Sequence, residues 1–165
     1  MSAESVRAFL AEHAPDAEIV DQGASTATVE EAAATLGVEP GRIAKTLSVR
    51  VGDLVVLVVA RGDARLDNRK VKDALGGRPR MLGAEEVMEL TGHPVGGVCP
   101  FGLATPLAVY CDLSLRDFDE VFPAAGSRTS SVRITPDRLA TVTGATWADL
   151  CRSPEIESAP ELPPK

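Results

Sequence analysis

The chain has 165 residues, a typical length for one domain, which argues against two independent enzyme domains. Hydrophobic residues make up 44% of the sequence and charged residues 25%, so a wholly disordered chain is excluded. The net charge is −7, and the longest apolar run, residues 54–60, is far shorter than the roughly 18 residues of a membrane span. The first residues carry acidic side chains and no apolar signal segment. We therefore expect a cytoplasmic protein that does not associate with a membrane.

The patterns of the first 60 residues predict two helices and three strands. In chain order they are a helix at 2–13, a strand at 17–20, a helix at 29–36 and a β-hairpin at 41–60. Thr28 and Glu31 form a capping box before the second helix, and Gly37 ends it. Gly52 and Asp53 form the hairpin turn. Because the run after this turn is apolar on both faces, its strand should lie in the centre of a sheet.

The remaining sequence continues the alternation of helices and strands. We expect helices at 68–75, 84–90, 136–142 and 146–151, and strands at 107–111, 120–122 and 131–134. Three glycines and three prolines exclude regular structure from residues 93–106. Four prolines and three acids predict a disordered tail at 152–165. Together these elements predict a single mixed α/β domain over residues 1–151.

Cysteine and histidine are too few and too widely spaced for a structural zinc site. The chain has three cysteines and two histidines, and no two cysteines have the CxxC spacing. We therefore expect no metal and no cofactor. The odd number of cysteines favours free thiols over a disulfide framework.

Positive charge is concentrated in one segment of this acidic chain. Residues 41–80 hold ten basic against four acidic side chains and carry +6, whereas the segments before and after them carry −7 and −6. Among these segments, this is the one suited to meet a nucleic-acid phosphate backbone. A solvated helix face of mixed charge is the alternative interpretation.

Lys45 interrupts the apolar face of a predicted strand. In residues 43–51 the odd positions are apolar apart from Lys45, so the alternation of a strand points its side chain inward. A buried ammonium without a partner costs on the order of several kcal/mol. A pocket that opens to water would explain the lysine. The alternatives are a lysine that extends to solvent from the strand end and a structural ion pair with a core acid.

A glycine-rich loop follows the fourth predicted helix. Glycines at 96, 97 and 102 let the backbone approach a ligand and expose N–H groups to an oxyanion or a phosphate. The loop lacks the ending of a P-loop and the spacing of a dinucleotide-binding motif. A tight structural turn is the alternative. Cys99 and His93 are candidates for a nucleophile and a general base, but without a second motif the sequence favours packing and hydrogen-bonding roles for them.

Three segments carry a resemblance to a known family. They are Ile43-Ala44-Lys45-Thr46-Leu47, the loop Thr91-Gly92-His93-Pro94-Val95-Gly96-Gly97-Val98-Cys99-Pro100-Phe101-Gly102, and the turn Ala124-Ala125-Gly126-Ser127. Together they resemble the YbaK/EbsC family, freestanding relatives of the editing domain inserted in bacterial prolyl-tRNA synthetases. The resemblance implies a mixed α/β fold in which helices surround a curved, mostly antiparallel sheet. It also implies hydrolysis of an amino acid wrongly esterified to the 3′ end of a tRNA, commonly proline tRNA. The implied partners are the tRNA acceptor end and prolyl-tRNA synthetase.

The resemblance further implies roles for individual residues. Lys45 would contact the terminal phosphate or the scissile ester, and the catalytic loop amides would be those of Gly96 and Gly97. The substrate-binding residues would be Thr46, His93, Val98, Cys99, Pro100, Phe101, Gly102, Ala124, Gly126 and Ser127. The tRNA phosphates would meet Arg61, Arg65, Arg69, Lys70, Lys72, Arg78 and Arg80. Ala124 stands where several relatives have a serine, which puts the amino-acid selectivity of the pocket in question.

The implied reaction needs no strong nucleophile, because an aminoacyl ester is already activated. Backbone N–H groups that stabilise the tetrahedral oxyanion would suffice, with a positioned water or the substrate's own hydroxyl as the nucleophile. A small pocket would also exclude a larger cognate amino acid by steric clash. Two alternatives remain open: a non-catalytic module that holds an aminoacyl-tRNA or nucleotide end, and a hydrolase of a small ester unrelated to tRNA.

Overall fold

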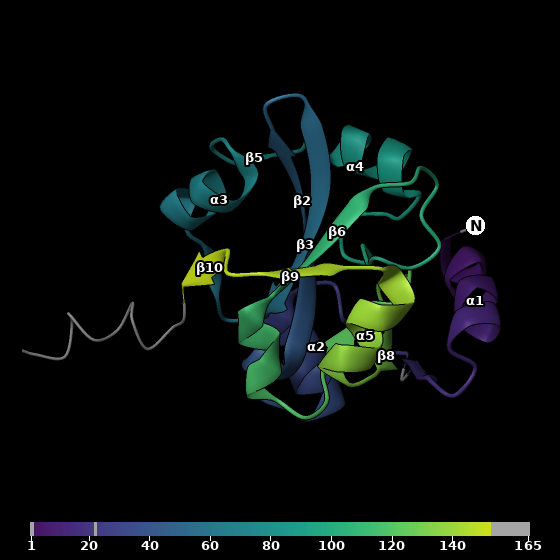
Figure 1. Ribbon diagram of the computed structural model, residues 1–165. Helices are drawn as coiled ribbons and strands as arrows, with labels where there is room; N and C mark the ends of the chain where they lie inside the picture. The colour runs from purple at the N-terminus through teal and green to yellow at the C-terminus, as the bar shows by residue number, and fades with distance from the viewer. Residues whose placement is uncertain (1, 22, 153–165) are drawn as a thin grey trace, which may run out of the picture.

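The computed structural model describes residues 2–21 and 23–152 (Figure 1). The helices are α1 (Ser2–His13), α2 (Val29–Leu36), α3 (Asn68–Leu75), α4 (Ala84–Thr91) and α5 (Pro136–Thr143), with 3₁₀ helices at Pro40–Arg42 and Leu113–Asp117. The strands are β1 (Glu18–Asp21), β2 (Ile43–Val51), β3 (Leu54–Arg61), β4 (Arg65–Leu66), β5 (Arg80–Met81), β6 (Ala108–Asp112), β7 (Phe122–Pro123), β8 (Ser130–Arg133), β9 (Thr146–Ala148) and β10 (Cys151–Arg152). Among these described residues, no helix is long and apolar enough to cross a bilayer.

Capping residues start and stop the helices where the sequence predicts. The Thr28 hydroxyl accepts a hydrogen bond from the Glu31 N–H at the start of α2, and Gly37 ends this helix at a φ of 72°. The Asp67 side chain caps α3 in the same way. Local sequence chemistry therefore sets the bounds of these helices.

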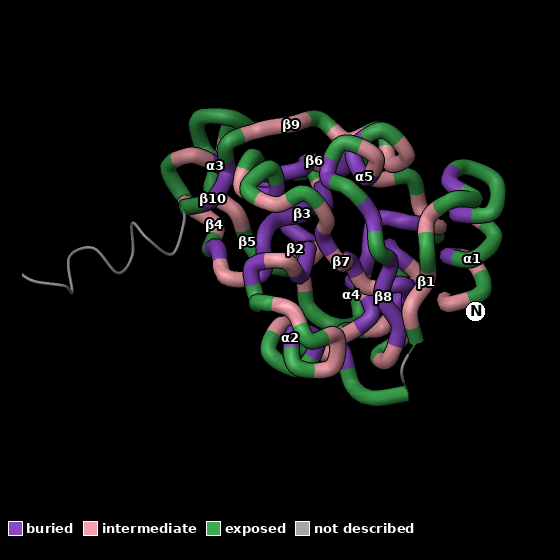
Figure 2. Tube along the Cα trace, turned by 90° about the horizontal axis from the view of Figure 1, so that it is seen from below, coloured by how far each residue is buried: buried purple, intermediate pink, exposed green. Residues whose placement is uncertain are grey.

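Strand β3 occupies the centre of a sheet with the strand order β5-β2-β3-β6-β9, to which β7 is added beside β2. The hairpin of β2 and β3 is antiparallel, whereas β6 runs parallel to β3 and β9 runs parallel to β6. Residues 56–60 of β3 are at most 1% exposed, because both faces of the sheet are covered (Figure 2). The mixed α/β fold and the central position of β3 are thus confirmed.

The two faces of the sheet pack against different helices. On one face Leu57 of β3 belongs to a core that includes Val6 of α1 and Leu139 of α5. On the other face Val58 of β3 packs in a core that includes Val71 of α3. Figures 1 and 2 both place α1 and α3 at opposite ends of the molecule.

One edge of β2 is paired at its two ends and open in between. Near its start, Ile43 and Ala44 pair in parallel with β7. Near its end, Val49 and Arg50 pair antiparallel with β5. Within the described part of the chain, no strand lies beside residues 45–47 on this edge. The sheet therefore has a gap at its margin.

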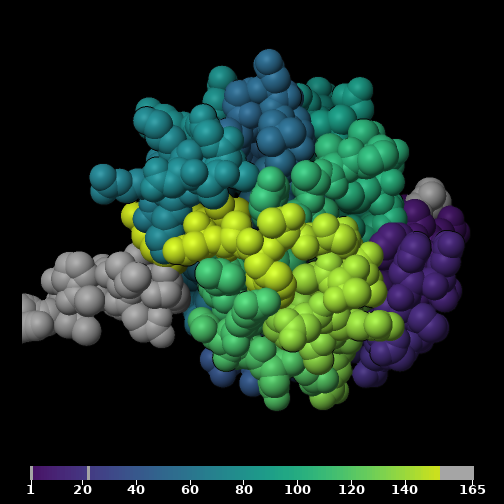
Figure 3. Space-filling view, viewed as in Figure 1, coloured from purple at the N-terminus to yellow at the C-terminus, as the bar shows by residue number. Residues whose placement is uncertain are grey.

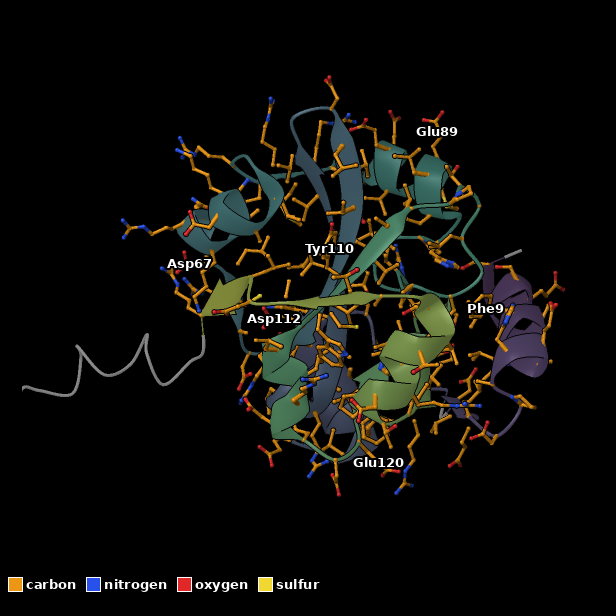
Figure 4. The ribbon with its side chains drawn as sticks, in the orientation of Figure 1. Phe9, Asp67, Glu89, Tyr110, Asp112 and Glu120 are labelled. Carbon is orange, nitrogen blue, oxygen red and sulfur yellow. The ribbon has the colours of Figure 1, made fainter. Side chains whose placement is uncertain are left out.

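The C-terminal segment differs from the sequence-based expectation. The helix expected over 146–151 is absent, and β9 and β10 occupy this stretch, paired with β6 and β4. The buried Asp112 carboxylate accepts hydrogen bonds from the backbone N–H groups of Leu150 at 2.7 Å and Cys151 at 2.9 Å (Figure 4). A side chain from elsewhere in the chain thus satisfies the donors that a helix would have used.

The expected tail starts one residue too early. Arg152 belongs to β10, where it pairs with Arg65, so the tail prediction for 152–165 is wrong at this position. Its remaining residues, 153–165, lie outside the described residues. Figure 3 shows the yellow atoms of the last described strands at the surface beside the teal atoms of α3.

Candidate functional site

A cavity of about 270 Å³ lies at the gap in β2. Its lining residues come from the segments 26–32, 43–48, 81–87, 95–98, 122–124 and from Ser131. Lys45 is the one ionisable side chain among the lining residues that the structure describes, and the rest of the wall is apolar or carries hydroxyl groups. In the same described part of the chain, no group of three or more metal-ligating side chains is placed to hold a metal ion.

Lys45 is partly buried and reaches toward the segment that follows β3. Its Nζ donates a hydrogen bond to the carbonyl of Ala64. Burial lowers the pKa of Lys45 below its ordinary value of 10.5, while the nearby Cys151 and Asp63 oppose that shift. An ammonium has three donors, so this hydrogen bond leaves two of them unused.

Thr46 and Thr26 bring two buried hydroxyl groups to the cavity wall. Thr26 is 7% exposed, and the Oγ1 atoms of both threonines are buried without a hydrogen-bond partner in the described structure. A buried hydroxyl without a partner costs roughly 1–3 kcal/mol. A polar group on a ligand would remove this cost. Thr26 was missed in the sequence, where its Ser/Thr-rich surroundings signal only a helix start.

The backbone of β2 also faces the gap. The Ser48 carbonyl accepts a hydrogen bond from the Leu82 N–H at 3.1 Å, on the edge away from β3. In an antiparallel pair, alternate residues point their backbone groups to the same edge. The N–H and C=O of Thr46 therefore point into the gap, where a ligand could meet them.

The glycine-rich loop contributes Gly96 and Val98 to the wall. The amide role expected for Gly97 needs correction, because the Gly97 N–H donates to the Pro94 carbonyl at 2.9 Å. Within the described residues, the N–H groups of Gly96 and Val98 make no hydrogen bond, so these are the available donors. Gly97 serves close packing instead, since a Cβ there would lie 2.9 Å from the backbone nitrogen of Ser127.

Three residues expected at the substrate lie beneath the loop. His93, Cys99 and Phe101 are 0% exposed and do not line the cavity. The ring nitrogens of His93 contact the Ser2 hydroxyl at 2.5 Å and the Phe101 carbonyl at 2.7 Å. Burial lowers the pKa of His93 and raises the pKa of Cys99 to about 12, so both are neutral at pH 7. The structure thus places these three residues beneath the loop and not in the cavity wall.

Four further residues expected at the substrate lie off the cavity wall: Pro100, Gly102, Gly126 and Ser127. A Cβ on Gly102 or Gly126 would approach backbone oxygens of α1 within 3 Å, so both glycines allow close packing against that helix. The Ser127 hydroxyl bonds that of Ser130 at 2.6 Å. In the late turn, Ala124 is the predicted residue that does line the cavity.

Two of the basic residues expected to bind tRNA are engaged within the protein. Arg61 is 8% exposed, bonds Asp63 at 2.6 Å and Asp117 at 2.7 Å, and lies 4.9 Å from the ring centre of Phe118. These hydrogen bonds, that to Asp63 foremost, raise the pKa of Arg61. Lys70 likewise bonds an acid, Asp149, at 3.0 Å. Both cations are therefore already paired with carboxylates of this chain, and Arg61 is also buried.

The other predicted tRNA contacts lie on the surface. Arg65, Arg69, Lys72, Arg78 and Arg80 are exposed, and none of them lines the cavity. Arg69 and Lys72 belong to α3, and Arg80 belongs to β5. These residues remain candidates for contacts with tRNA beyond the cavity.

Comparison with known proteins places this cavity in a family. The aminoacyl-tRNA editing domain matches residues 24–142, a range that contains every described lining residue of the cavity. The chain therefore belongs to the aminoacyl-tRNA editing domain family, and the YbaK/EbsC resemblance is confirmed.

Individual relatives agree with this assignment. The chain is 47% identical over 154 residues to YwhH of Bacillus subtilis, an uncharacterised protein, covering 92% of this chain and 98% of YwhH. It is 29% identical over 126 residues to EbsC of Enterococcus faecalis, described as a "putative Cys-tRNA(Pro)/Cys-tRNA(Cys) deacylase", covering 74% and 76% of the two chains. A crystal structure of a "putative trans-editing enzyme for prolyl tRNA synthetase" matches with a TM-score of 0.84 and 38% identity, covering 92% of this chain and 98% of that one.

Proposed function

We propose that this protein hydrolyses the ester bond of wrongly charged aminoacyl-tRNA, with a small amino acid on proline tRNA as the substrate. The observation that carries the proposal is the apolar cavity of about 270 Å³ with Lys45 as its one ionisable described lining residue. Membership of the editing-domain family supports the reaction class. The names of EbsC and of the solved relative support proline tRNA and prolyl-tRNA synthetase as partners.

The cavity of about 270 Å³ has room for a small aminoacyl group. Binding sites for drug-sized ligands span about 300–1,000 Å³. The small side chain of the amino acid would enter among Ala44, Val98 and Ala124, which line the wall. The ribose and the rest of the tRNA would stay outside. A larger cognate side chain would be excluded by clash, which is how a second sieve achieves selectivity.

The wall supplies charge stabilisation for the hydrolysis. Water attacks the ester carbonyl, and negative charge develops on the carbonyl oxygen. The free N–H groups of Gly96 and Val98 and the Lys45 ammonium are the candidates to stabilise that charge. When water is the nucleophile, the bond from the carbonyl carbon to the ribose oxygen breaks, and the proton lost by the water passes to that oxygen. The products are a free amino acid and an uncharged tRNA.

A deacylation panel tests the proposal. Proline tRNA charged with alanine, cysteine, serine, 2-aminobutyrate or proline is incubated with the protein, with and without prolyl-tRNA synthetase. Release of a small amino acid but not of proline is expected. Binding of the charged tRNA without any release would support the alternative, a non-catalytic module. Cleavage of a simple amino-acid ester without preference for tRNA would support the small-ester hydrolase.

A further inference from the structure

Arg128 connects two segments of the cavity wall. Its backbone carbonyl accepts a hydrogen bond from the Thr26 N–H at 2.7 Å, and its Nε donates to the Val95 carbonyl at 2.9 Å. Both Thr26 and Val95 line the cavity. Arg128 does not itself line the cavity, but one hydrogen bond on each side holds it beside the wall, although it lies outside the basic segment that the sequence indicates.

The side chain of Arg128 lies against the glycine-rich loop. A Cβ built on Gly96 would lie 3.2 Å from the Cγ and 3.3 Å from the Nε of Arg128, so the missing side chain makes room for the arginine. Arg128 is exposed, and within the described residues its two terminal guanidinium nitrogens have no hydrogen-bond partner. They form a fork whose geometry suits the oxygens of a phosphate.

The chemistry of a charged tRNA end requires a phosphate near this position. The scissile ester and the 5′-phosphate of the terminal nucleotide are attached to the same ribose. If the aminoacyl group fills the cavity, that phosphate must lie just outside the mouth. A cation there also matters because the chain as a whole carries −7 and would otherwise repel the tRNA.

We infer that Arg128 binds the 5′-phosphate of the terminal nucleotide and thereby positions the ester in the cavity. This inference rests on the proposed function and adds a substrate contact to it. It separates two kinds of tRNA contact: Arg128 at the mouth reads the last phosphate, and the exposed residues of the basic segment would meet phosphates further along the acceptor stem.

Small substrates isolate this contact. The test compares 3′-O-alanyl-adenosine with and without a 5′-phosphate, together with alanyl-tRNA(Pro), on the wild type, Arg128→Met and Arg128→Lys. For Arg128→Met we expect kcat/KM to fall about tenfold on the phosphorylated ester and on the tRNA, mainly through a higher KM. A tenfold loss corresponds to about 1.4 kcal/mol of binding free energy. On the unphosphorylated ester it should stay within about twofold of the wild type. Arg128→Lys should recover part of the loss, because it restores the charge without the fork.

A matched control removes an equal charge elsewhere. Arg133 is an exposed arginine of β8 that pairs with Glu120 at 2.9 Å and does not line the cavity. Arg133→Met should leave the ratio between the two adenosine esters unchanged. An equal loss by Arg128→Met on both esters would mean that Arg128 only holds the two wall segments together, and this would overturn the inference. No loss on either ester would overturn it as well.

Failure of the proposed function gives a different result. In that case the wild type releases alanine from none of the three substrates. The contact is then measured by equilibrium binding of uncharged proline tRNA to the wild type and to Arg128→Met. Weaker binding by Arg128→Met than by Arg133→Met would retain the phosphate contact, and equal binding would overturn it.

Discussion

The sequence predicts a functional role both for the cavity wall and for the seven basic residues between positions 61 and 80, but the two are built in opposite ways. The wall gathers residues from six separated stretches of the chain around one ammonium. The basic residues lie close together in sequence, yet they differ in the structure. Arg61 and Lys70 form ion pairs with acidic residues of the same chain, while Arg69 and Lys72 are exposed to solvent. In an acidic chain, a cluster of bases along the sequence is therefore not by itself a phosphate-binding surface.

The largest effect should come from Lys45 in the cavity wall. Lys45→Met should lower kcat/KM for deacylation at least about a hundredfold, or roughly 2.7 kcal/mol of transition-state stabilisation. The melting temperature should be kept, because an apolar side chain of similar length replaces a partly buried charge. Deacylation and thermal melting are measured on the same preparation. A folded variant with the wild-type rate would show that the lysine is structural.

The charge of Lys45 also predicts a dependence on pH. The ammonium exists below its pKa, and burial lowers this pKa from 10.5. Its contribution to kcat/KM should therefore decline with rising pH earlier than expected for an exposed lysine. The decline is measured as the ratio of wild-type to Lys45→Met rates across the alkaline range. A constant ratio would contradict a role for the charged form.

A substitution at Arg61 tests whether its ion pairs stabilise the fold. Arg61→Met should reduce the free energy of unfolding by about 2 kcal/mol, because it removes charged hydrogen bonds to Asp63 and Asp117. Urea unfolding measures this loss. The salt dependence of tRNA binding should not change. A stable variant with weakened tRNA binding would instead assign Arg61 to the tRNA contact.

The exposed basic residues should affect tRNA binding and leave the stability of the fold unchanged. Arg69, Lys72 and Arg78 replaced together by alanine should leave stability unchanged but raise KM for tRNA. Affinity for tRNA falls as salt rises, and each lost phosphate contact reduces the steepness of log affinity against log salt by roughly 0.7–0.9. Three lost contacts therefore predict a slope that is shallower by about 2–3. Binding titrations at several salt concentrations measure the slope. An unaltered slope would place the tRNA elsewhere on the surface.

A smaller effect is expected at Ala124, within the wall. Ala124→Ser adds a hydroxyl beside the amino-acid side chain, so it should change the ranking of accepted amino acids. The best substrate should remain within about tenfold of the wild-type rate, or about 1.4 kcal/mol. The deacylation panel gives the ranking directly. The same order of substrates before and after the change would exclude a selective role for Ala124.

The smallest effect is expected at Thr26, where one substitution should change the stability of the protein and its choice of amino acid in opposite directions. Thr26→Val removes a buried hydroxyl without a partner, which should stabilise the empty protein by about 1 kcal/mol. It should also lower kcat/KM for seryl-tRNA relative to 2-aminobutyryl-tRNA by about threefold, because these side chains differ mainly in one hydroxyl. Unfolding and the rate ratio are both measured. Loss of stability would show that the hydroxyl has a partner in solution.

Most local elements, and the segments that carry the site, can be predicted from the amino-acid sequence. Capping residues such as Thr28 and Asp67 act within one helical turn, so the local sequence predicts where these helices begin. The unbroken apolar run of β3 likewise predicts a strand that is buried on both faces. The ordered Lys-Thr strand, glycine-rich loop and late turn indicated the family, since they occur as continuous stretches. Lys45, Gly96, Val98 and Ala124 could be named for the same reason.

Which neighbours of those residues reach the cavity depends on how the folded segments pack against each other. Val98 and Cys99 are adjacent in sequence, yet one lines the cavity and the other is buried, because the irregular loop has no fixed period from which to predict orientation. The C-terminal strands depended on Asp112, about 40 residues away in the chain, and local propensity cannot include such a partner. Arg128 is a further example: its place beside the cavity wall comes from hydrogen bonds to two distant segments, and those contacts exist only once the chain has folded.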